Sequence, residues 1–336
     1  MRAAITQAHG DRSQLRYVAD YPDPTAGPDE VVLRVAASAV NYHDIVTRRG
    51  MPGITIPLPV IVGSDISGTV VSLGGDVGTW QVGDRVLLDP VLRGEGRFGM
   101  IGEVFDGGRA ELVKVPAAQL TRVPDGVSLD DAAALPLAYG TARRMLYTNG
   151  RLARGEKVLI LGASGGVGVA CVQLAKLAGA EVIACASSRT KIERLQALGA
   201  DHVIDYVEEP FEQAVRRIYG KPRVKGGGGV DLAINFTGGD TWTPTQKCIR
   251  AGGRILTCGA TAGFDVHTDL RYLWTFEQQL IGSNGWAMED LDDLLARIAA
   301  GQFRPVIDKV LPLEEVAEAE RLLEDREVFG KVVLKP

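Results

Sequence analysis

Long apolar runs are missing from this 336-residue chain, and their absence limits where the protein can reside. No run approaches the ~20 residues that a membrane-spanning helix needs. The first residues, Met1 to Gln7, lack the apolar core of a signal peptide. Basic clusters are missing as well, because lysine and arginine are scattered and the formal net charge is -5. The sequence therefore predicts a cytoplasmic protein with neither a membrane nor a nucleic acid as partner.

Cysteine is sparse, and its spacing excludes the common metal and disulfide patterns. The four cysteines are Cys171, Cys185, Cys248 and Cys258. None belongs to a Cys-x-x-Cys pair, and each lies in or beside an apolar segment. We expect buried free thiols.

The length favours two domains, because single cores seldom grow to this size. Up to about residue 124, short strand-like segments alternate with turns such as Gly83-Asp84. The strands are expected at 2–7, 30–36, 66–73, 85–88 and 110–115. This pattern predicts a mostly β domain of barrel type over residues 1–124.

Strands and helices alternate after residue 124. The strands are expected at 158–161, 182–186, 202–204, 231–235, 254–258 and 279–281, and the helices at 128–134, 141–147, 169–177, 191–198 and 212–218. Such alternation predicts an α/β fold of Rossmann type over residues 125–285, a doubly wound parallel sheet. The tail, 286–336, is expected to fold back onto the first domain with helices at 291–300 and 313–323 and strands at 307–310 and 331–334.

A glycine-rich turn between the first of these strands and its helix predicts a dinucleotide site. The turn consists of Gly162, Ala163, Ser164, Gly165, Gly166, Val167 and Gly168. Glycines let a pyrophosphate approach the amides at the helix start, where the helix dipole favours negative charge. Ala163 occupies the place of the first glycine of the usual fingerprint. The alternative is a turn that binds no ligand.

The end of the second strand of this domain predicts NADPH as the cofactor. No acid follows Ala186 to bind ribose hydroxyls. Instead Ser187, Ser188, Arg189 and Lys191 form a pattern suited to a 2′-phosphate, with which arginine can pair through two hydrogen bonds. A solvated basic helix start is the alternative.

Several motifs together resemble the medium-chain dehydrogenase/reductase superfamily over essentially the whole chain. They are Val40 to Asp44, Pro59 to Gly68, Val82 to Val86, Gly162 to Gly168, Leu198 to Asp201, Gly252 to Arg254 and Phe329 to Leu334. The sequence looks closest to the zinc-free quinone oxidoreductase and enoyl reductase branch. The resemblance implies a GroES-like catalytic domain (1–124), an NADP-binding Rossmann domain (125–285) and a return to the catalytic domain (286–336).

The departures from the zinc alcohol dehydrogenases imply that no catalytic metal is bound. Asn41 stands where those enzymes have a cysteine ligand, Ser64 and Asp65 replace a His-Glu pair, and the third ligand falls near Leu137. The stretch 89–106, which corresponds to their structural zinc lobe, contains no cysteine. An amide, a hydroxyl and one carboxylate do not supply the ligands that zinc prefers.

The resemblance places the substrate side in an active-site loop that contains Asn41, Tyr42 and His43. Asn41 would hydrogen-bond a carbonyl or merely hold the loop. His43 would donate a proton, bind the cofactor ribose or stay solvated. Tyr42 would be the alternative donor or an aromatic wall.

The resemblance also implies further cofactor contacts, namely Thr141, Asn235, Thr237, Gly259, Ala260 and Lys331. Thr141 would face the nicotinamide, with a helix N-cap as the alternative. Lys331 would lie near the phosphates, with a solvated strand end as the alternative.

Without a metal, alcohol oxidation is difficult, because the alkoxide-like state loses its Lewis acid. The sequence therefore favours NADPH-dependent hydride transfer to a conjugated C=C bond or a quinone, where hydrogen-bond donors can hold the enolate oxygen. The alternatives are an alcohol dehydrogenase or carbonyl reductase, and a nucleotide-binding protein without turnover. The aromatic segment Tyr272 to Phe276 is expected to line the substrate pocket or to pack across a dimer interface. The family resemblance implies a homodimer.

Overall fold

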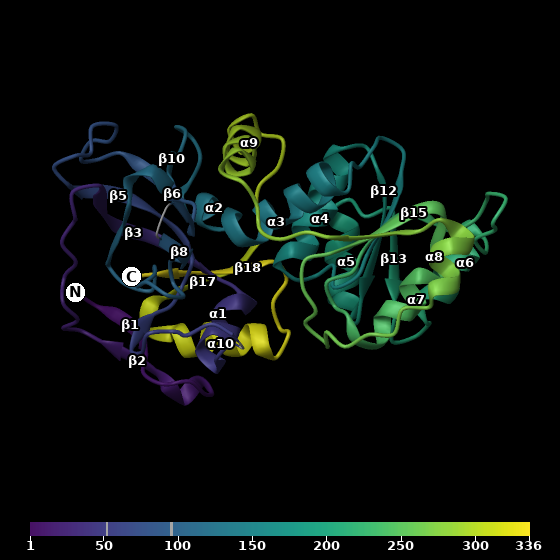
Figure 1. The fold of residues 1–336 in the computed structure, drawn as a ribbon, viewed down its shortest axis with the longest axis horizontal. Coiled ribbons are helices and arrows are strands. Elements are labelled where there is room, and N and C mark those ends of the chain that lie inside the picture. The colour runs from purple at the N-terminus through teal and green to yellow at the C-terminus, as the bar shows by residue number, and fades with distance from the viewer. Residues whose placement is uncertain (52, 95–96) are drawn as a thin grey trace. The chain divides into compact units, whose positions relative to one another are not determined.

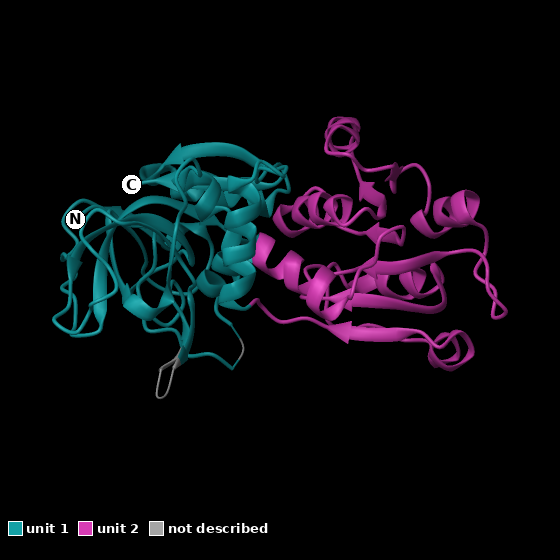
Figure 2. Cartoon of the chain, turned by 90° about the horizontal axis from the view of Figure 1, so that it is seen from above, with its two compact units in different colours: residues 1–138, 287–336 teal, residues 139–286 magenta. Residues whose placement is uncertain are grey.

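The computed structural model describes residues 1–51, 53–94 and 97–336, which form two compact units. Unit 1 comprises residues 1–138 and 287–336, and unit 2 comprises residues 139–286 (Figure 2). The sequence placed the first boundary at 124/125. The division falls later because helix α2 (Leu129–Ala133) packs on the strands of unit 1. Ser128 caps α2 as expected, accepting a hydrogen bond from Asp131 N at 3.0 Å.

Unit 1 is built on a sheet with the strand order β10-β6-β5-β3-β18-β17, and β9 also pairs with β3. The strands are β3 (Glu30–Val40), β5 (Asp65–Leu73), β6 (Arg85–Leu88), β9 (Leu112–Pro116), β10 (Leu120–Arg122), β17 (Ile307–Pro312) and β18 (Lys331–Lys335). Val332 pairs with Val40 and Leu334 with Ser38, so the tail completes this sheet. The apolar faces of these strands bury Leu33, Ile66, Val86 and Val113 in one core.

Smaller elements complete unit 1. They are β1 (Ala3–Thr6), β2 (Leu15–Val18), β4 (Val60–Ile61), β7 (Val91–Gly94), β8 (Arg97–Met100), α1 (Tyr42–Arg49), α9 (Met288–Ala299) and α10 (Val316–Glu324). The family resemblance placed Asn41, Tyr42 and His43 in an active-site loop, whereas in the structure Tyr42 opens helix α1. The helix starts there because the Asp44 carboxylate accepts a hydrogen bond from Asn41 N.

Unit 2 is a parallel sheet with helices on both faces (Figure 1). The strand order is β13-β12-β11-β14-β15-β16. The strands are β11 (Lys157–Ile160), β12 (Glu181–Ala186), β13 (His202–Asp205), β14 (Val230–Ile234), β15 (Ile249–Thr257) and β16 (Gln279–Gly282). The predicted α/β fold is confirmed, because every strand pair in this sheet is parallel.

The helices of unit 2 are α3 (Thr141–Arg143), α4 (Gly166–Leu177), α5 (Arg189–Ala197), α6 (Phe211–Tyr219), α7 (Trp242–Gln246) and α8 (Leu270–Phe276). Residues 135–140 and 144–149 wind as π-helix on either side of α3. Leu159, Ile183 and Ile255 pack with Phe211 and Trp242 in one buried cluster, so neighbouring strands and two helices share a core. The four cysteines are free, and all except the half-buried Cys258 are buried.

None of the helices in the described part of the chain has the length and apolar character that a bilayer crossing requires.

Candidate functional site

A buried ammonium group joins three segments of unit 1. Lys331, the first residue of β18, is 2 % exposed. Its Nζ donates to Asn41 Oδ1 and, at 3.0 Å, to Asp65 Oδ2. Asp65 Oδ1 accepts a second hydrogen bond, from Leu137 N at 2.9 Å. The sequence assigned Lys331 to the cofactor phosphates, whereas the structure buries its charge beside Asn41 and Asp65.

Asn41 lies at the N-cap of α1, yet its side chain does not cap the helix. Its backbone N–H donates to Asp44 Oδ2 at 2.9 Å, while its side-chain oxygen is turned to Lys331. The side-chain nitrogen makes one long hydrogen bond, 3.4 Å to Ala39 O. An asparagine at an N-cap usually uses its side chain on the helix amides, whereas the side-chain oxygen of Asn41 accepts from Lys331.

His43, in the first turn of α1, is paired with a carboxylate that the sequence analysis missed. His43 Nε2 lies 2.8 Å from Glu103 Oε2. Burial of the ring lowers the pKa of His43, but the hydrogen bond to Glu103 and the charges of Asp44, Glu103 and Asp65 outweigh it, so the pKa is raised above its ordinary value. The imidazole is therefore biased toward its protonated, proton-donating form.

A chain of buried ion pairs holds α1 from behind. Arg109 Nη2 donates to Asp44 Oδ2 at 3.1 Å, and Arg109 Nη1 pairs with Glu320 of α10. The other oxygen of Glu320 accepts from Arg48 Nε at 2.6 Å. Burial raises the pKa of Asp44, and the Arg109 guanidinium opposes that rise. The network fixes the helix that carries Asn41 and His43.

Tyr42 lies in the same turn but is 38 % exposed. Its place on α1 is compatible with either of the roles expected from the sequence.

The glycine-rich turn of unit 2 has the geometry of a phosphate cradle. Gly162 has φ +65°, which favours glycine, and a Cβ there would lie 2.9 Å from the ring of Phe236. A Cβ on Gly168 would collide with the Gly162 carbonyl, so helix and strand need glycine to pack. A Cβ on Gly165 would contact only Gly162 O, at 3.7 Å. Open space thus lies over the start of α4, whose N-cap, Gly165, offers no side chain to its amides.

The ends of β14 and β15 lie beside this turn. Thr237 Oγ1 would be 3.5 Å from a Cβ on Gly162, and Ala262 N donates to Thr237 O at 2.7 Å. Gly259 and Ala260 belong to the loop that follows β15, where Thr257 Oγ1 donates to Gly259 O at 2.8 Å. The structure therefore brings three predicted cofactor segments together at the carboxyl edge of the sheet.

Asn235 is buried, and its polar atoms serve its own loop. Its amide nitrogen donates to Thr241 Oγ1 at 3.1 Å and to Thr245 Oγ1 at 2.9 Å. Its oxygen accepts from Thr237 N at 3.1 Å and Gly238 N at 3.0 Å. Asn235 therefore holds the loop that carries Thr237.

The predicted 2′-phosphate residues follow β12 on an exposed edge. Ser188 caps α5, with Oγ accepting from Lys191 N at 3.4 Å. The Arg189 side chain is 93 % exposed and reaches Glu193 Oε1 at 2.9 Å. Ser187 is exposed beside them. The start of α5 is therefore basic and accessible. Both a 2′-phosphate site and a solvated basic helix start require this.

Thr141 is buried in unit 2 as the first residue of α3. Gly140 before it is itself helical, so Thr141 is not an N-cap. A Cβ on Gly140 would lie 2.9 Å from Trp286 Cγ, which explains the glycine at this close approach.

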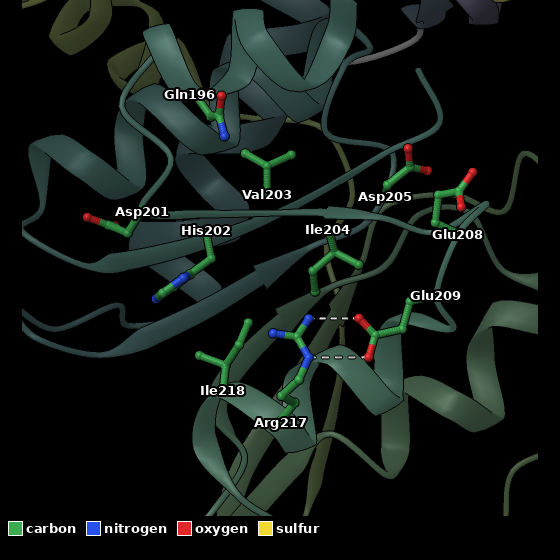
Figure 3. Close-up of a pocket in the computed structure, with 10 residues that line it drawn as sticks. All are labelled: Gln196, Asp201, His202, Val203, Ile204, Asp205, Glu208, Glu209, Arg217 and Ile218. Carbon is green, nitrogen blue, oxygen red and sulfur yellow. Dashed lines mark hydrogen bonds and ion pairs between the residues drawn. The ribbon is translucent and has the colours of Figure 1, made fainter. Parts of the chain in front are cut away.

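A separate groove of about 380 Å³ lies on the edge strand of unit 2, lined by Gln196, Asp201, His202, Val203, Ile204, Asp205, Glu208, Glu209, Arg217 and Ile218. Figure 3 shows Arg217 facing Glu209, with Nη2 2.7 Å from Oε2. None of the predicted site residues belongs to this lining.

The donor groups of unit 1 do not fit a catalytic zinc ion. The described residues bring no three His, Cys, Asp or Glu side chains together as a metal cluster. Asn41 and Asp65, at two of the positions that the family resemblance aligns with zinc ligands, both direct an oxygen at the Lys331 ammonium. A second cation at those oxygens would meet the first.

The partners of the predicted residues escaped the sequence analysis. Glu103 is 60 positions from His43, and Glu320 is 211 positions from Arg109. Nothing local marks either carboxylate. The sequence shows only an acidic side chain at each of these positions, and the structure is needed to show that both are buried.

Comparisons with known proteins identify the family of this chain. Residues 27–125 match the family described as alcohol dehydrogenase GroES-like domain, and residues 166–300 match the family described as zinc-binding dehydrogenase. An acryloyl-coenzyme A reductase of Sulfurisphaera tokodaii is 30 % identical over 331 residues, which cover 94 % of this chain and 95 % of that protein.

Two solved structures resemble the whole chain. One is an NAD-dependent alcohol dehydrogenase, 37 % identical with a TM-score of 0.91 and full coverage of both chains. The other is the 2-octenoyl-CoA carboxylase reductase CinF in complex with NADP and 2-octenoyl-CoA, 29 % identical with a TM-score of 0.87, covering 99 % of this chain and 87 % of that one. The chain thus belongs to the medium-chain dehydrogenase/reductase superfamily.

Proposed function

We propose that the protein is a zinc-independent, NADPH-dependent reductase of conjugated C=C bonds in α,β-unsaturated carbonyl compounds, with quinones as a second substrate type. The observation that carries this proposal is the buried cluster of Asn41, Lys331 and Asp65. It offers an amide donor backed by a buried ammonium group where metal-dependent relatives would need a Lewis acid. Such donors suit an enolate oxygen, whereas an alkoxide requires more.

Unit 2 fits the nicotinamide cofactor, which supplies the hydride when bound. The amides at the start of α4 would hold the pyrophosphate, and the open space over Gly165 admits it. Thr237, Gly259 and Ala260 would line the ring side, together with the buried Thr141. Ser187, Ser188, Arg189 and Lys191 would bind the 2′-phosphate.

Unit 1 would hold the carbonyl end of the substrate. When hydride adds to the β-carbon, the π electrons move toward the carbonyl oxygen and form an enolate. Asn41 Nδ2 would donate to that oxygen, and one preorganised donor of this kind changes kcat by about 10²–10³-fold. His43 would then protonate the α-carbon, so that one hydride and one proton saturate the double bond.

Relatives supply the expected substrate class. An acryloyl-coenzyme A reductase and a complex with 2-octenoyl-CoA both concern enoyl thioesters. We therefore propose enoyl thioesters as the first candidates, ahead of simple enones and quinones.

A substrate panel tests the proposal. NADPH oxidation is followed with crotonyl-CoA, an enone, a quinone and an aldehyde, in metal-free buffer and with added zinc. Turnover of the first three without metal is the expected result. Turnover of the aldehyde alone supports the alcohol dehydrogenase alternative, which the NAD-dependent neighbour favours. NADPH binding without turnover supports a non-catalytic role.

We also propose a homodimer formed through the free edge of the unit 2 sheet. Strand β16 ends the strand order, and its neighbour α8 contains no buried residue. Leu270, Trp274 and Leu280 expose 60 %, 67 % and 39 % of their surface on these two elements. An unpaired edge with exposed apolar side chains favours pairing with a second copy.

A further inference from the structure

The Asn41 amide can face Lys331 in only one orientation, because an ammonium group donates hydrogen bonds and accepts none. The atom of the Asn41 amide that faces Lys331 must therefore be the carbonyl oxygen. This fixes the nitrogen on the other side of the amide. The contact thus decides between the two orientations that an asparagine side chain usually can adopt.

The amide nitrogen of Asn41 keeps donor capacity in this orientation. One N–H makes the 3.4 Å hydrogen bond to Ala39 O, which is long for N–H···O. Within the described part of the chain, its second N–H has no acceptor. Asn41 is only 4 % exposed, so this donor is held in a largely dry environment, where hydrogen bonds to a developing charge are strongest.

Lys331 is itself fixed. Asp65 is fully buried, holds the ammonium at 3.0 Å and is tied to Leu137 N through its other oxygen. Ordering a lysine side chain costs conformational entropy, so its ammonium stays in one place only if a partner holds it there. Here the partner is Asp65, which lies on β5 and is bonded to the segment before α3, so the charge remains beside the Asn41 oxygen.

A fixed positive charge on the oxygen of an amide draws electrons from its nitrogen and makes the N–H a stronger donor. We propose that Lys331 is a positioning residue that orients and polarises Asn41 for enolate stabilisation, taking the place of the metal's positive charge. This inference rests on the proposed reduction of conjugated carbonyl compounds. Lys331 acts through Asn41, since its ammonium is buried and already bonded to two side chains.

The test is a double-mutant cycle with Lys331→Met, Asn41→Ala and both together. We expect Lys331→Met to lower kcat for crotonyl-CoA about 10–100-fold while KM and the Kd for NADPH change less than threefold. The double variant should be no slower than Asn41→Ala, because the lysine acts only through that amide. Additive losses, or an unchanged kcat in Lys331→Met, would overturn the proposal.

The matched control is Lys335→Met. Lys335 lies on the same strand and pairs with Asp130 at the surface. Its replacement should leave kcat unchanged. Lys331→Arg tests whether a cation of different shape restores part of the rate, and circular dichroism of every variant identifies those that fail to fold.

A second measurement does not require turnover. The side-chain amide of Asn41 is assigned in ¹H–¹⁵N spectra by its loss in Asn41→Ala. In Lys331→Met both amide protons should move upfield, because the polarising charge is gone, and Lys335→Met should leave them in place. Unchanged resonances in Lys331→Met refute the inference, whatever the substrate panel shows. If the panel shows that the protein reduces no conjugated substrate, the proposed function fails, and the spectra alone then decide whether Lys331 polarises Asn41.

Discussion

The pair of His43 and Glu103 gives the proposed proton donor a defined pH range. His43 is held above its ordinary pKa of about 6.5 by Glu103 and two further carboxylates, against the effect of burial. The stabilisation that this pair gives to the fold is fully present below the pKa that His43 has in the unfolded chain. It is lost as pH rises through the pKa of His43 in the folded protein. Activity that needs the imidazolium is expected to fall as pH rises through the pKa of His43 in the folded protein.

Replacing Glu103 by Gln should move the alkaline limb of the kcat profile to lower pH, because the imidazolium loses the carboxylate that is hydrogen-bonded to it. The profile is measured with crotonyl-CoA at saturating NADPH. Glu111→Gln, which removes a surface carboxylate bonded to Arg2, is the control and should leave the limb in place. An unmoved limb in Glu103→Gln would show that His43 is not the proton donor.

Arg189 decides the proposed preference for NADPH. Its side chain is 93 % exposed at the start of α5, so it can turn from Glu193 to a bound phosphate at little cost. Arg189→Glu should raise the Kd for NADPH at least about tenfold and change that for NADH little. Fluorescence titration measures both. Lys225→Glu is the control, because Lys225 is an exposed residue of the same unit that lies before Gly226 to Gly229, outside the turn at 162–168. Equal wild-type affinities for the two cofactors would contradict the assignment.

Single residues show where sequence reasoning reached its limit. The glycine turn and the basic stretch after β12 were both visible in the sequence. The burial of Lys331 was not, because a lone lysine in a strand gives no sign of burial. Glu103 was missed for a related reason, since only the fold brings residues 60 positions apart into contact.

At the level of elements, α1 depends on α10 for its position. Arg48 and Arg109 are both buried and share the two oxygens of Glu320. Removing one member of a buried ion network leaves charges unpaired, at a cost of about 3–5 kcal/mol. Helix α1, which carries the proposed proton donor His43, is therefore tied to α10.

Glu320→Gln should lower the free energy of unfolding by about 3–5 kcal/mol, because two buried guanidinium groups lose the carboxylate that they share. Urea unfolding monitored by circular dichroism measures this. Glu318→Gln, two residues earlier on the same helix, breaks only a surface pair with Arg321 and should change stability by less than about 1 kcal/mol. A similar small effect in both variants would mean that the buried network contributes little.

The elements themselves were largely predictable, since most expected strands and helices appear within a few residues of their structural bounds. Strand β6 spans the predicted 85–88, and α4 contains the predicted 169–177. The misses have local causes. Helix α1 has an apolar pattern too weak to read, and β4 and β10 are too short to show periodicity.

At the level of the whole molecule, the proposed dimer is tested by one substitution at the sheet edge. Trp274→Asp should convert the protein to a monomer, because it places a charge in an apolar contact. Sedimentation velocity measures the change in mass. Val207→Asp is the control, since Val207 is equally exposed, at 67 %, but follows β13 at the opposite edge of the sheet. A wild-type protein that sediments as a monomer would refute the proposal.

The interruption of unit 1 by unit 2 imposes an order on synthesis. As the chain leaves the ribosome, residues 139–286 are complete before β18 exists, so the nucleotide-binding unit can fold first. Strand β3 meanwhile presents the edge that β18 will later occupy. Lys331 follows residues 139–286 in the chain, so its ammonium can meet Asn41 only after all of unit 2 has been synthesised, and the sheet of unit 1 is completed last.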